Sequence, residues 1–294
     1  MLHIKNLKKT YSSSVLALKG VSLEITSGMF GLLGPNGACK TTLMKILATL
    51  LEPDSGAAEM NGVDLIANKG AARRMLGYLP QEFGLYPSLT AAQTLDYFAK
   101  LKGVWDSKER AALVDALLER GNLSALRKQK VGEFSGGMRQ RLGIAQALIA
   151  QTTLVIVDEP AAGLDPEERV RFHNLLSDTA GDDRVVILST HIVSDASNLC
   201  GQMAIIRLGE ILAARSPGEA VAELAGSVWE AVVPRESVAA LKSHLKTISA
   251  NAFDGRTRLR VISHGERPGD EFMPATPTLE DYYLNLVSRA GSAA

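Results

Sequence analysis

The sequence of 294 residues has little of several features that would indicate other classes of protein. Two cysteines, Cys39 and Cys200, are too few for a disulfide framework, which favours reduced thiols and a cytoplasmic location. No apolar run approaches the roughly 18 residues that a membrane-spanning helix needs, and no secretory signal pattern follows Met1. The formal net charge is zero, so composition does not point to nucleic acid or an anionic membrane surface. We therefore expect a cytoplasmic protein that reaches a membrane only through a partner.

The stretch with the most specific pattern is residues 34–42. It follows a short apolar run at residues 29–33 and precedes apolar residues at helical spacing, so we expect strand, glycine-rich turn and helix. Backbone N–H groups in such a turn, together with the positive end of the helix, bind phosphate. The residues are Gly34, Pro35, Asn36, Gly37, Ala38, Cys39, Lys40, Thr41 and Thr42. In this pattern Lys40 reaches the β- and γ-phosphates, and the Thr41 hydroxyl is placed to ligate Mg²⁺.

Two carboxylates follow the most apolar strand pattern in the chain. Residues 154–157 are continuously apolar, as in a parallel strand that is buried on both faces. Asp158 and Glu159 come next, at the carboxyl end of the strand, where α/β folds place ligands. We expect Asp158 to hold Mg²⁺, directly or through water, and Glu159 to act as general base for a water attacking the γ-phosphate.

Three further side chains are candidates whose patterns are ambiguous by themselves. Gln81 follows a predicted strand and could touch Mg²⁺, or it could be a solvated loop residue. His191 ends another predicted strand and could contact the γ-phosphate, or be structural. Tyr11 could stack on an adenine ring, or be a core tyrosine at a strand edge.

A second phosphate-binding pattern lies at Ser135, Gly136 and Gly137. Serine as N-cap followed by two glycines at a helix start is an anion site of the same physical type as the first. The alternative is an ordinary capped helix. Upstream, the loop at residues 83–86 is expected to expose apolar and aromatic side chains, which a partner would cover.

The pattern changes near residue 215, so we predict a domain at residues 1–215, with a helical part at about 88–150, and an accessory domain at 216–294. In the accessory domain we expect strands at 228–233 and 259–263 and helices at 236–246 and 278–288. We find no catalytic constellation there. It is predicted to be a small α/β domain for regulation, dimerisation or docking.

Taken together, residues 1–215 resemble the ATP-binding subunit of an ABC transporter. The resemblance rests on an aromatic A-loop, Walker A, Q-loop, signature, Walker B, D-loop and switch histidine, in that order. They lie at Tyr11, residues 34–42, Gln81, residues 135–137, residues 154–159, Gly163-Leu164-Asp165 and His191. The pattern at residues 277–281 is similar to bacterial drug- and antibiotic-export ATPases of the ABC-2 type.

The resemblance implies an α/β P-loop fold with a mixed sheet core, an antiparallel β subdomain and a helical subdomain. It implies ATP and Mg²⁺ as cofactors, with Thr41, Gln81 and Asp158 around the metal. Two copies would sandwich ATP between them. The signature residues and Asp165 of one copy would then meet the nucleotide that the other copy binds. An integral membrane permease would contact the chain near residues 81–86 at the inner face of the membrane, and nucleic acid would not be a partner.

One departure from the family pattern is Cys39, which stands where Walker A has glycine. A Cβ there disfavours the backbone angles of the loop, at a cost of about 1–3 kcal/mol. Two alternatives to a transport ATPase therefore stay open: a nucleotide-binding switch with weak or no hydrolysis, and a soluble ABC protein outside transport. The helix N-terminus and Lys40 also predict a lowered pKa for the Cys39 thiol.

Overall fold

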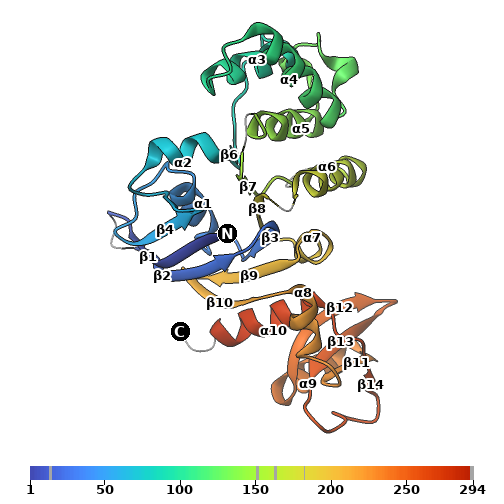
Figure 1. Cartoon of the computed structure of the whole chain (residues 1–294). Coiled ribbons are helices and arrows are strands. Elements are labelled where there is room, and N and C mark those ends of the chain that lie inside the picture. Colours follow the sequence, from blue (N-terminus) through green and yellow to red (C-terminus); the bar gives the residue numbers. More distant parts are fainter. Residues whose placement is uncertain (13–14, 150–151, 162–163, 182, 292–294) are drawn as a thin grey trace. The chain divides into compact units, whose positions relative to one another are not determined.

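A computed structural model describes residues 1–12, 15–149, 152–161, 164–181 and 183–291. Ala150, at the end of the predicted helical part, and Gly163, in the predicted D-loop, lie outside the described residues. The chain divides into two compact units, Met1–Ala214 and Arg215–Ala294, and each is described by itself (Figure 1).

The first unit begins with an antiparallel sheet in which strands alternate buried and exposed residues. Its order is β2-β1-β4-β5, and Leu2 lies opposite Ile25 on one neighbour and opposite Met60 on the other. The strands are β1 (Leu2–Thr10), β2 (Leu16–Ile25), β4 (Ser55–Met60) and β5 (Val63–Asp64). The alternation buries one face and leaves the other polar.

A six-stranded sheet in the order β10-β9-β3-β8-β7-β6 carries the candidate site. Strands β9, β3, β8, β7 and β6 are parallel, so their carboxyl ends meet at one edge. The bounds are β3 (Gly28–Leu33), β6 (Leu76–Leu79), β7 (Leu154–Asp158), β8 (Val185–Thr190), β9 (Gln202–Arg207) and β10 (Glu210–Arg215). Every residue of β7 is buried, which confirms the prediction from the apolar run at residues 154–157, and every residue of β8 is buried as well.

The helices of the first unit are α1 (Lys40–Leu47), α2 (Lys69–Met75), α3 (Ala91–Leu101), α4 (Ser107–Arg120), α5 (Gly136–Ala147), α6 (Pro166–Thr179) and α7 (Val193–Leu199). Figure 1 shows α3, α4 and α5 grouped together, and they contact one another. Ser135 caps α5, as predicted. Leu50, which matched the helical spacing after the glycine-rich turn, lies beyond the end of α1.

One hydrophobic core joins both sheets of this unit to α1. Leu18 of β2, Leu32 of β3, Leu43 of α1 and Ile156 of β7 are each buried within it. Burying a leucine or isoleucine contributes about 1.5–3 kcal/mol, so α1 and the preceding turn have a rigid support.

The second unit holds a sheet in the order β12-β13-β11-β14. Its elements are α8 (Pro217–Ala222), β11 (Val228–Val233), α9 (Val238–His244), β12 (Lys246–Phe253), β13 (Arg256–Ile262), β14 (Met273–Pro274) and α10 (Leu279–Gly291). The predicted helix at 236–246 is wrong at its end, because Lys246 begins β12. Strand β12 had no sequence prediction, since its large apolar residues, Ile248 and Phe253, do not form an alternating pattern.

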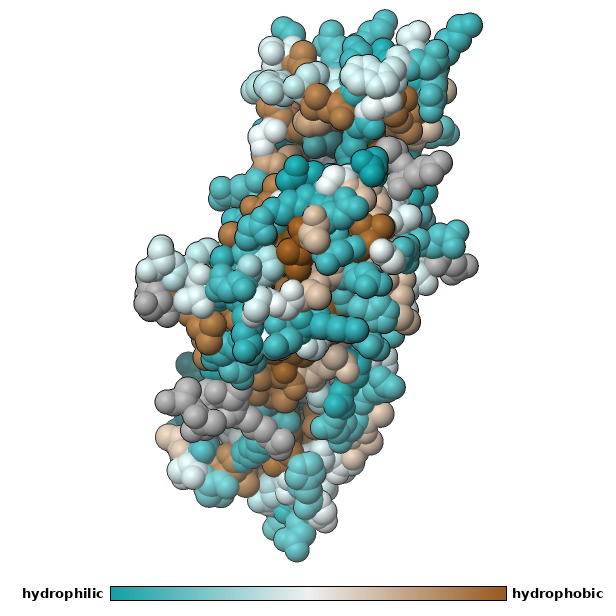
Figure 2. Space-filling view, turned by 60° about the vertical axis from the view of Figure 1, so that its left-hand side comes forward, coloured by the Kyte–Doolittle hydropathy of each residue, from teal (hydrophilic) through white to brown (hydrophobic). Residues whose placement is uncertain are grey.

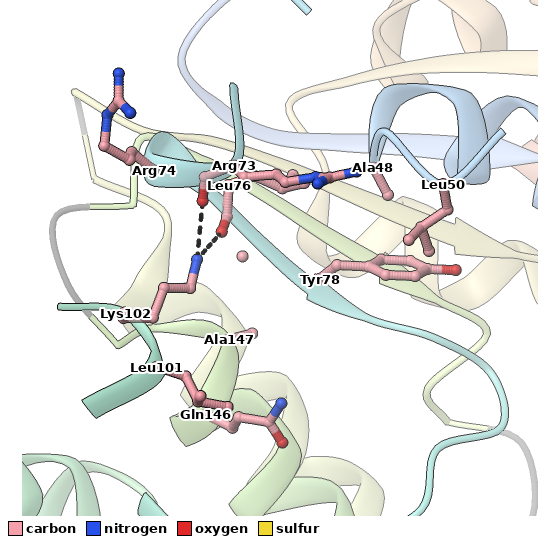
Figure 3. A pocket seen from close by; sticks show the side chains of 11 residues that line it. Ala48, Leu50, Arg73, Arg74, Leu76, Tyr78, Leu101, Lys102, Gln146 and Ala147 are labelled. Carbon is pink, nitrogen blue, oxygen red and sulfur yellow. Dashed lines mark hydrogen bonds between the residues drawn. The ribbon is translucent and has the colours of Figure 1, made fainter. Parts of the chain in front are cut away.

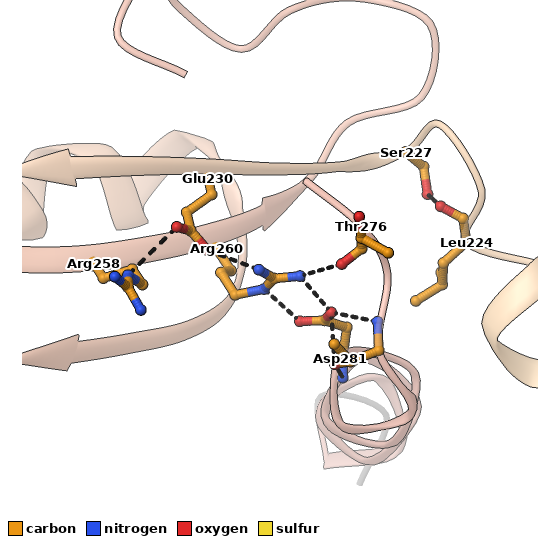
Figure 4. Close-up of polar contacts among 8 residues, drawn as sticks. Leu224, Ser227, Glu230, Arg258, Arg260, Thr276 and Asp281 are labelled. Atoms are coloured by element: carbon orange, nitrogen blue, oxygen red, sulfur yellow. Dashed lines mark hydrogen bonds and ion pairs between the residues drawn. The ribbon is translucent and has the colours of Figure 1, made fainter. Parts of the chain in front are cut away.

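A partly buried ion-pair network stabilises the second unit (Figure 4). Arg260 of β13 donates to both carboxylate oxygens of Asp281, at 2.9 and 2.7 Å, and to Glu230 at 2.7 Å. It also donates to the carbonyl oxygen of Thr276. The pKa of Arg260 is raised, chiefly by the bond to Asp281. The network joins α10 to the sheet.

The face of the molecule in Figure 2 is mostly hydrophilic, with apolar side chains in small separate groups. Large apolar side chains that are exposed include Leu50, Leu101 and Trp105. Within the part of the chain that the structure describes, no helix is both long and apolar enough to cross a bilayer.

Candidate functional site: a phosphate-binding cavity

The glycine-rich turn connects β3 to α1, as its pattern predicted. Gly34 packs against β9 so closely that a Cβ would lie 2.4 Å from the carbonyl oxygen of Ile206. Gly37 has a φ of +79° and Cys39 a φ of 71° with ψ of 23°. Cys39 is therefore in the left-handed region that favours glycine, and it precedes the first residue of α1 without a side-chain cap.

A cavity of about 520 Å³ opens at the carboxyl edge of the parallel strands. It brings together residues from the turn, from the end of β6 and from the ends of β7 and β8. Its lining is Asn36, Gly37, Ala38, Cys39, Lys40, Thr41, Thr42, Gln81, Glu159 and His191. Segments about 150 residues apart in the sequence thus share one polar cavity, because parallel strands end at the same edge.

The ammonium group of Lys40 is directed toward its own loop and Glu159. Lys40 is only 4% exposed, and its Nζ donates to the carbonyl oxygens of Gly34 and Pro35 at 2.7 and 3.2 Å. The same Nζ lies 3.0 Å from Glu159 Oε1. A phosphate entering the cavity would compete with these acceptors for the positive charge.

Glu159 lies between Lys40 and His191. Its Oε2 is 3.1 Å from His191 Nδ1, and its backbone N–H donates to the carbonyl oxygen of Ser189 at 3.0 Å. Its φ of 46° is unusual for a non-glycine residue and is of the kind found where structure constrains a functional side chain. The carboxylate faces the cavity and is able to accept a proton from a water held there.

Asp158 is fully buried, and neither of its carboxylate oxygens has a hydrogen-bond partner among the described residues. Burial raises the pKa of Asp158, while the nearby hydroxyls of Ser189 and Thr41 oppose that shift. A buried carboxylate without partners is costly. A divalent cation at the Thr41 and Asp158 oxygens would remove this cost, so the donor set fits Mg²⁺.

Tyr11 and Gln81 take positions beside the turn. The Tyr11 hydroxyl lies 3.1 Å from Thr42 Oγ1, and the residue is 40% exposed, so a role as core tyrosine is excluded. Gln81 is exposed, follows β6 and lines the cavity. In the adjoining loop Phe83 is half-buried against α5, and only part of the predicted apolar exposure remains, at Tyr86.

The signature residues lie outside this cavity. Ser135 Oγ accepts from the Met138 N–H at 3.2 Å, and Met138 Sδ accepts from the Ser135 N–H at 3.4 Å. Ser135 and Gly136 are exposed, and a Cβ on Gly136 would meet open space. A Cβ on Gly137 would instead lie 2.3 Å from Glu168 Oε2 of α6. Asp165, also outside the cavity, caps α6 by accepting from the Glu168 N–H.

The prediction of a lowered pKa for Cys39 is wrong. Burial raises the pKa of this thiol, and the positive charge of Lys19 offsets that only in part. Cys39 packs against the core at the base of the turn, so desolvation outweighs the helix N-terminus. Cys200 is buried more deeply, and burial raises its pKa to about 12.

Three polar residues near the site had no sequence prediction. Ser189 faces Asp158 from β8, Glu168 packs against the signature helix, and Asp195 lies buried behind the His191 turn. Ser189 could have been found as a polar residue that ends an apolar strand. Glu168 and Asp195 carry no local signal, because each is defined by partners on other elements.

The strand, turn and helix with their polar cavity define a P-loop nucleotide-binding fold. The family model described as "ABC transporter" matches residues 18–162. The chain is 35% identical over 287 residues to the daunorubicin resistance ATP-binding protein DrrA3 of Streptomyces coeruleorubidus, covering 92% of this chain and 90% of that protein. It is 31% identical over 299 residues to the Nod factor export ATP-binding protein I of Burkholderia orbicola, covering 98% and 97%.

The chain spans about half, 47%, of a further relative, the probable multidrug ABC transporter ATP-binding protein YbhF of Escherichia coli, at 33% identity over 90% of this chain. Among solved structures, cbiO1 from Clostridium perfringens matches with a TM-score of 0.69 and 26% identity, over 76% of this chain and 90% of that one. The dimeric post-hydrolysis cassette MJ0796 bound to ADP and Pi matches with a TM-score of 0.66 and 26% sequence identity. The match covers 74% of this chain and 98% of that one. The chain belongs to the ATP-binding subunits of ABC transporters.

Proposed function

We propose that this chain is a Mg²⁺-dependent ATPase subunit that sandwiches ATP with a second copy and powers export through separate membrane subunits. The observation that carries the proposal is Glu159, which lines the cavity at 3.1 Å from His191 and 3.0 Å from Lys40. It follows the buried Asp158, whose carboxylate oxygens have no hydrogen-bond partner among the described residues. Relatives named for drug resistance and Nod factor export support the transport role.

Each side chain then has a part in hydrolysis. Lys40 leaves Glu159 and binds the phosphates, and Glu159 accepts the proton of the attacking water. His191 contacts the γ-phosphate, and Tyr11 stacks on adenine. Thr41, Asp158 and Gln81 would hold Mg²⁺, which when bound would neutralise phosphate charge. A nucleotide switch without hydrolysis would not require Glu159 and His191 in this arrangement.

The second copy is proposed because the signature site is incomplete within one chain. Ser135 and Gly136 are exposed at the start of α5, whose first backbone N–H groups lack helical partners. They do not line the cavity of their own chain. In the proposed dimer they meet the γ-phosphate of ATP held by the other copy, with Asp165 at the same interface.

We further propose that the membrane subunit contacts residues 81–86 and an adjoining part of this unit that contains a cavity of about 690 Å³ (Figure 3). Leu50 and Leu101 line it and are 62% and 65% exposed. Lys102 Nζ donates to the carbonyl oxygens of Arg73 and Leu76, at 3.0 and 2.7 Å. An apolar segment bearing a carboxylate fits this lining. Through this contact with the membrane subunit, the present chain would be peripheral at the inner face of the membrane.

The test of hydrolysis is Glu159→Gln, which keeps the size of the side chain and removes the base. Steady-state ATP turnover should fall by about 10²- to 10⁴-fold while ATP binding is kept. The exposed Glu59→Gln on β4 is the matched control and should behave as the wild type. Unchanged turnover in Glu159→Gln would sink the assignment.

A further inference from the structure

A cluster of polar side chains surrounds the buried Asp195, where α6 and α7 meet the end of β8. We call it the Asp195 cluster; it consists of Asp195, Arg169, His173 and Thr190. Asp195 is 1% exposed, and its Oδ1 accepts a hydrogen bond from Arg169 Nε at 3.1 Å. His173 Nε2 lies 3.2 Å from the same oxygen, and Thr190 Oγ1 donates to Oδ2 at 3.2 Å.

Arg169 supplies the charge that compensates this buried carboxylate. Burial lowers the pKa of His173, and that effect outweighs the attraction of Asp195, so the imidazole is mainly neutral near pH 7. The guanidinium of Arg169 lies on the second turn of α6, whose first turn is capped by Asp165. The carboxylate therefore joins α6 to the end of β8.

Thr190 transmits this contact to His191, the next residue. Its hydroxyl accepts from the Ile192 N–H at 3.0 Å while it donates to Asp195. Its carbonyl oxygen accepts from the N–H of Gly34 at 3.3 Å. The backbone on both sides of His191 is thus fixed, although the His191 side chain itself is 41% exposed. A hydroxyl that both donates and accepts links the backbone of this turn to the Asp195 carboxylate.

We propose that Asp195 is a positioning residue for ATP hydrolysis, acting through the Thr190 hydroxyl to hold His191 against Glu159. The inference rests on the proposed role of His191. Asp195 touches neither the cavity nor the reacting atoms. It supplies the fixed acceptor that keeps the Thr190 hydroxyl, and hence the His191 turn, in place while nucleotide enters and leaves.

The experiment uses Thr190→Val, which keeps the shape of the side chain and removes the hydroxyl, with Thr190→Ser as the conservative variant. We expect Thr190→Val to lower kcat about tenfold with KM for ATP changed less than about twofold. Thr190→Ser should restore most of kcat. A purely structural role would lower the melting temperature and leave the kcat of the remaining folded protein unchanged.

A double-mutant cycle then connects the effect to His191. In a His191→Ala background, Thr190→Val should cause no further loss of kcat, because the residue it positions is gone. An equal further loss in that background would overturn the inference, as would an unchanged kcat in Thr190→Val. Loss of turnover in Glu159→Gln combined with full turnover in Thr190→Val would leave the proposed function standing and reject only the positioning role.

Discussion

Lys40 Nζ lies 3.0 Å from Glu159 Oε1, so the cation expected to bind phosphate is paired with the carboxylate expected to activate water. The Lys40 side chain is 4% exposed and that of Glu159 is 9% exposed, so water screens this pair little. In the proposed mechanism ATP would separate the two and so free Glu159 to act as base. Nucleotide binding and activation of water would then be coupled by this one contact.

The first prediction follows from that pair. Glu159→Gln should bind Mg-ATP more tightly than the wild type, by roughly 3- to 10-fold, because Lys40 no longer leaves an ion pair. Equilibrium titration of ATP by calorimetry measures the change. Glu167→Gln, on an exposed turn of α6, is the control and should leave affinity unchanged. A weaker affinity in Glu159→Gln would contradict the coupling.

The second prediction concerns the left-handed conformation of Cys39. Cys39→Gly should raise ATP affinity, because glycine adopts a φ of 71° without the strain of a Cβ. Relief of about 1–3 kcal/mol of backbone strain corresponds to a roughly 5- to 150-fold higher ATP affinity if it is expressed wholly in binding.

Cys39→Ala is the matched control for that measurement, since it removes the thiol and keeps the Cβ. The ATP affinity of Cys39→Ala should stay near that of the wild type. If its ATP affinity rises as much as that of Cys39→Gly, the sulfur and not the backbone conformation limits binding.

The third prediction concerns thiol reactivity and pH. Since the pKa of Cys39 is raised by burial, its thiolate fraction at pH 8 is below that of free cysteine, so alkylation by iodoacetamide should be slower and should increase as pH rises above 9. Cys200, with a pKa of about 12, should stay unlabelled in the folded protein.

Mg-ATP should protect Cys39 from alkylation, because the residue lines the cavity. Mass spectrometry over a pH series tests this, and a Cys39 rate already maximal at pH 7 would disprove it.

The fourth prediction compares the two signature glycines. Gly137→Ala should destabilise the fold by about 1–3 kcal/mol, because its Cβ would meet Glu168 and disturb the ion pair of Glu168 with Arg141. Gly136→Ala meets open space, so its melting temperature should match the wild type. Its turnover should nevertheless fall, since the methyl group would face the phosphate in the proposed dimer. Thermal melts and ATPase assays distinguish the two, and equal stability of both variants would count against the close packing at Gly137.

Much of the fold could be predicted from local patterns. Residues 29–33, 34–42 and 154–159 form the expected strand, turn, helix and buried strand, because periodicity and glycine placement act over short distances. The N-cap at Ser135 is local for the same reason. Strand β12 and the short helix α2 were missed, since neither has a strong pattern of its own and both depend on packing against other elements.

The sequence by itself determined the glycine-rich turn and the position of Glu159 at the end of a buried strand, because both patterns are local. The patterns of Gln81 and His191 were ambiguous, and the fold placed both side chains in the cavity. Only the tertiary structure decided the electrostatic states of the site residues. It buried Cys39 against the core and raised the pKa that a helix N-terminus was expected to lower. It left Asp158 without hydrogen-bond partners among the described residues, and it placed Asp195 behind His191. Desolvation and ion pairing depend on neighbours far apart in the chain, and no local pattern encodes them.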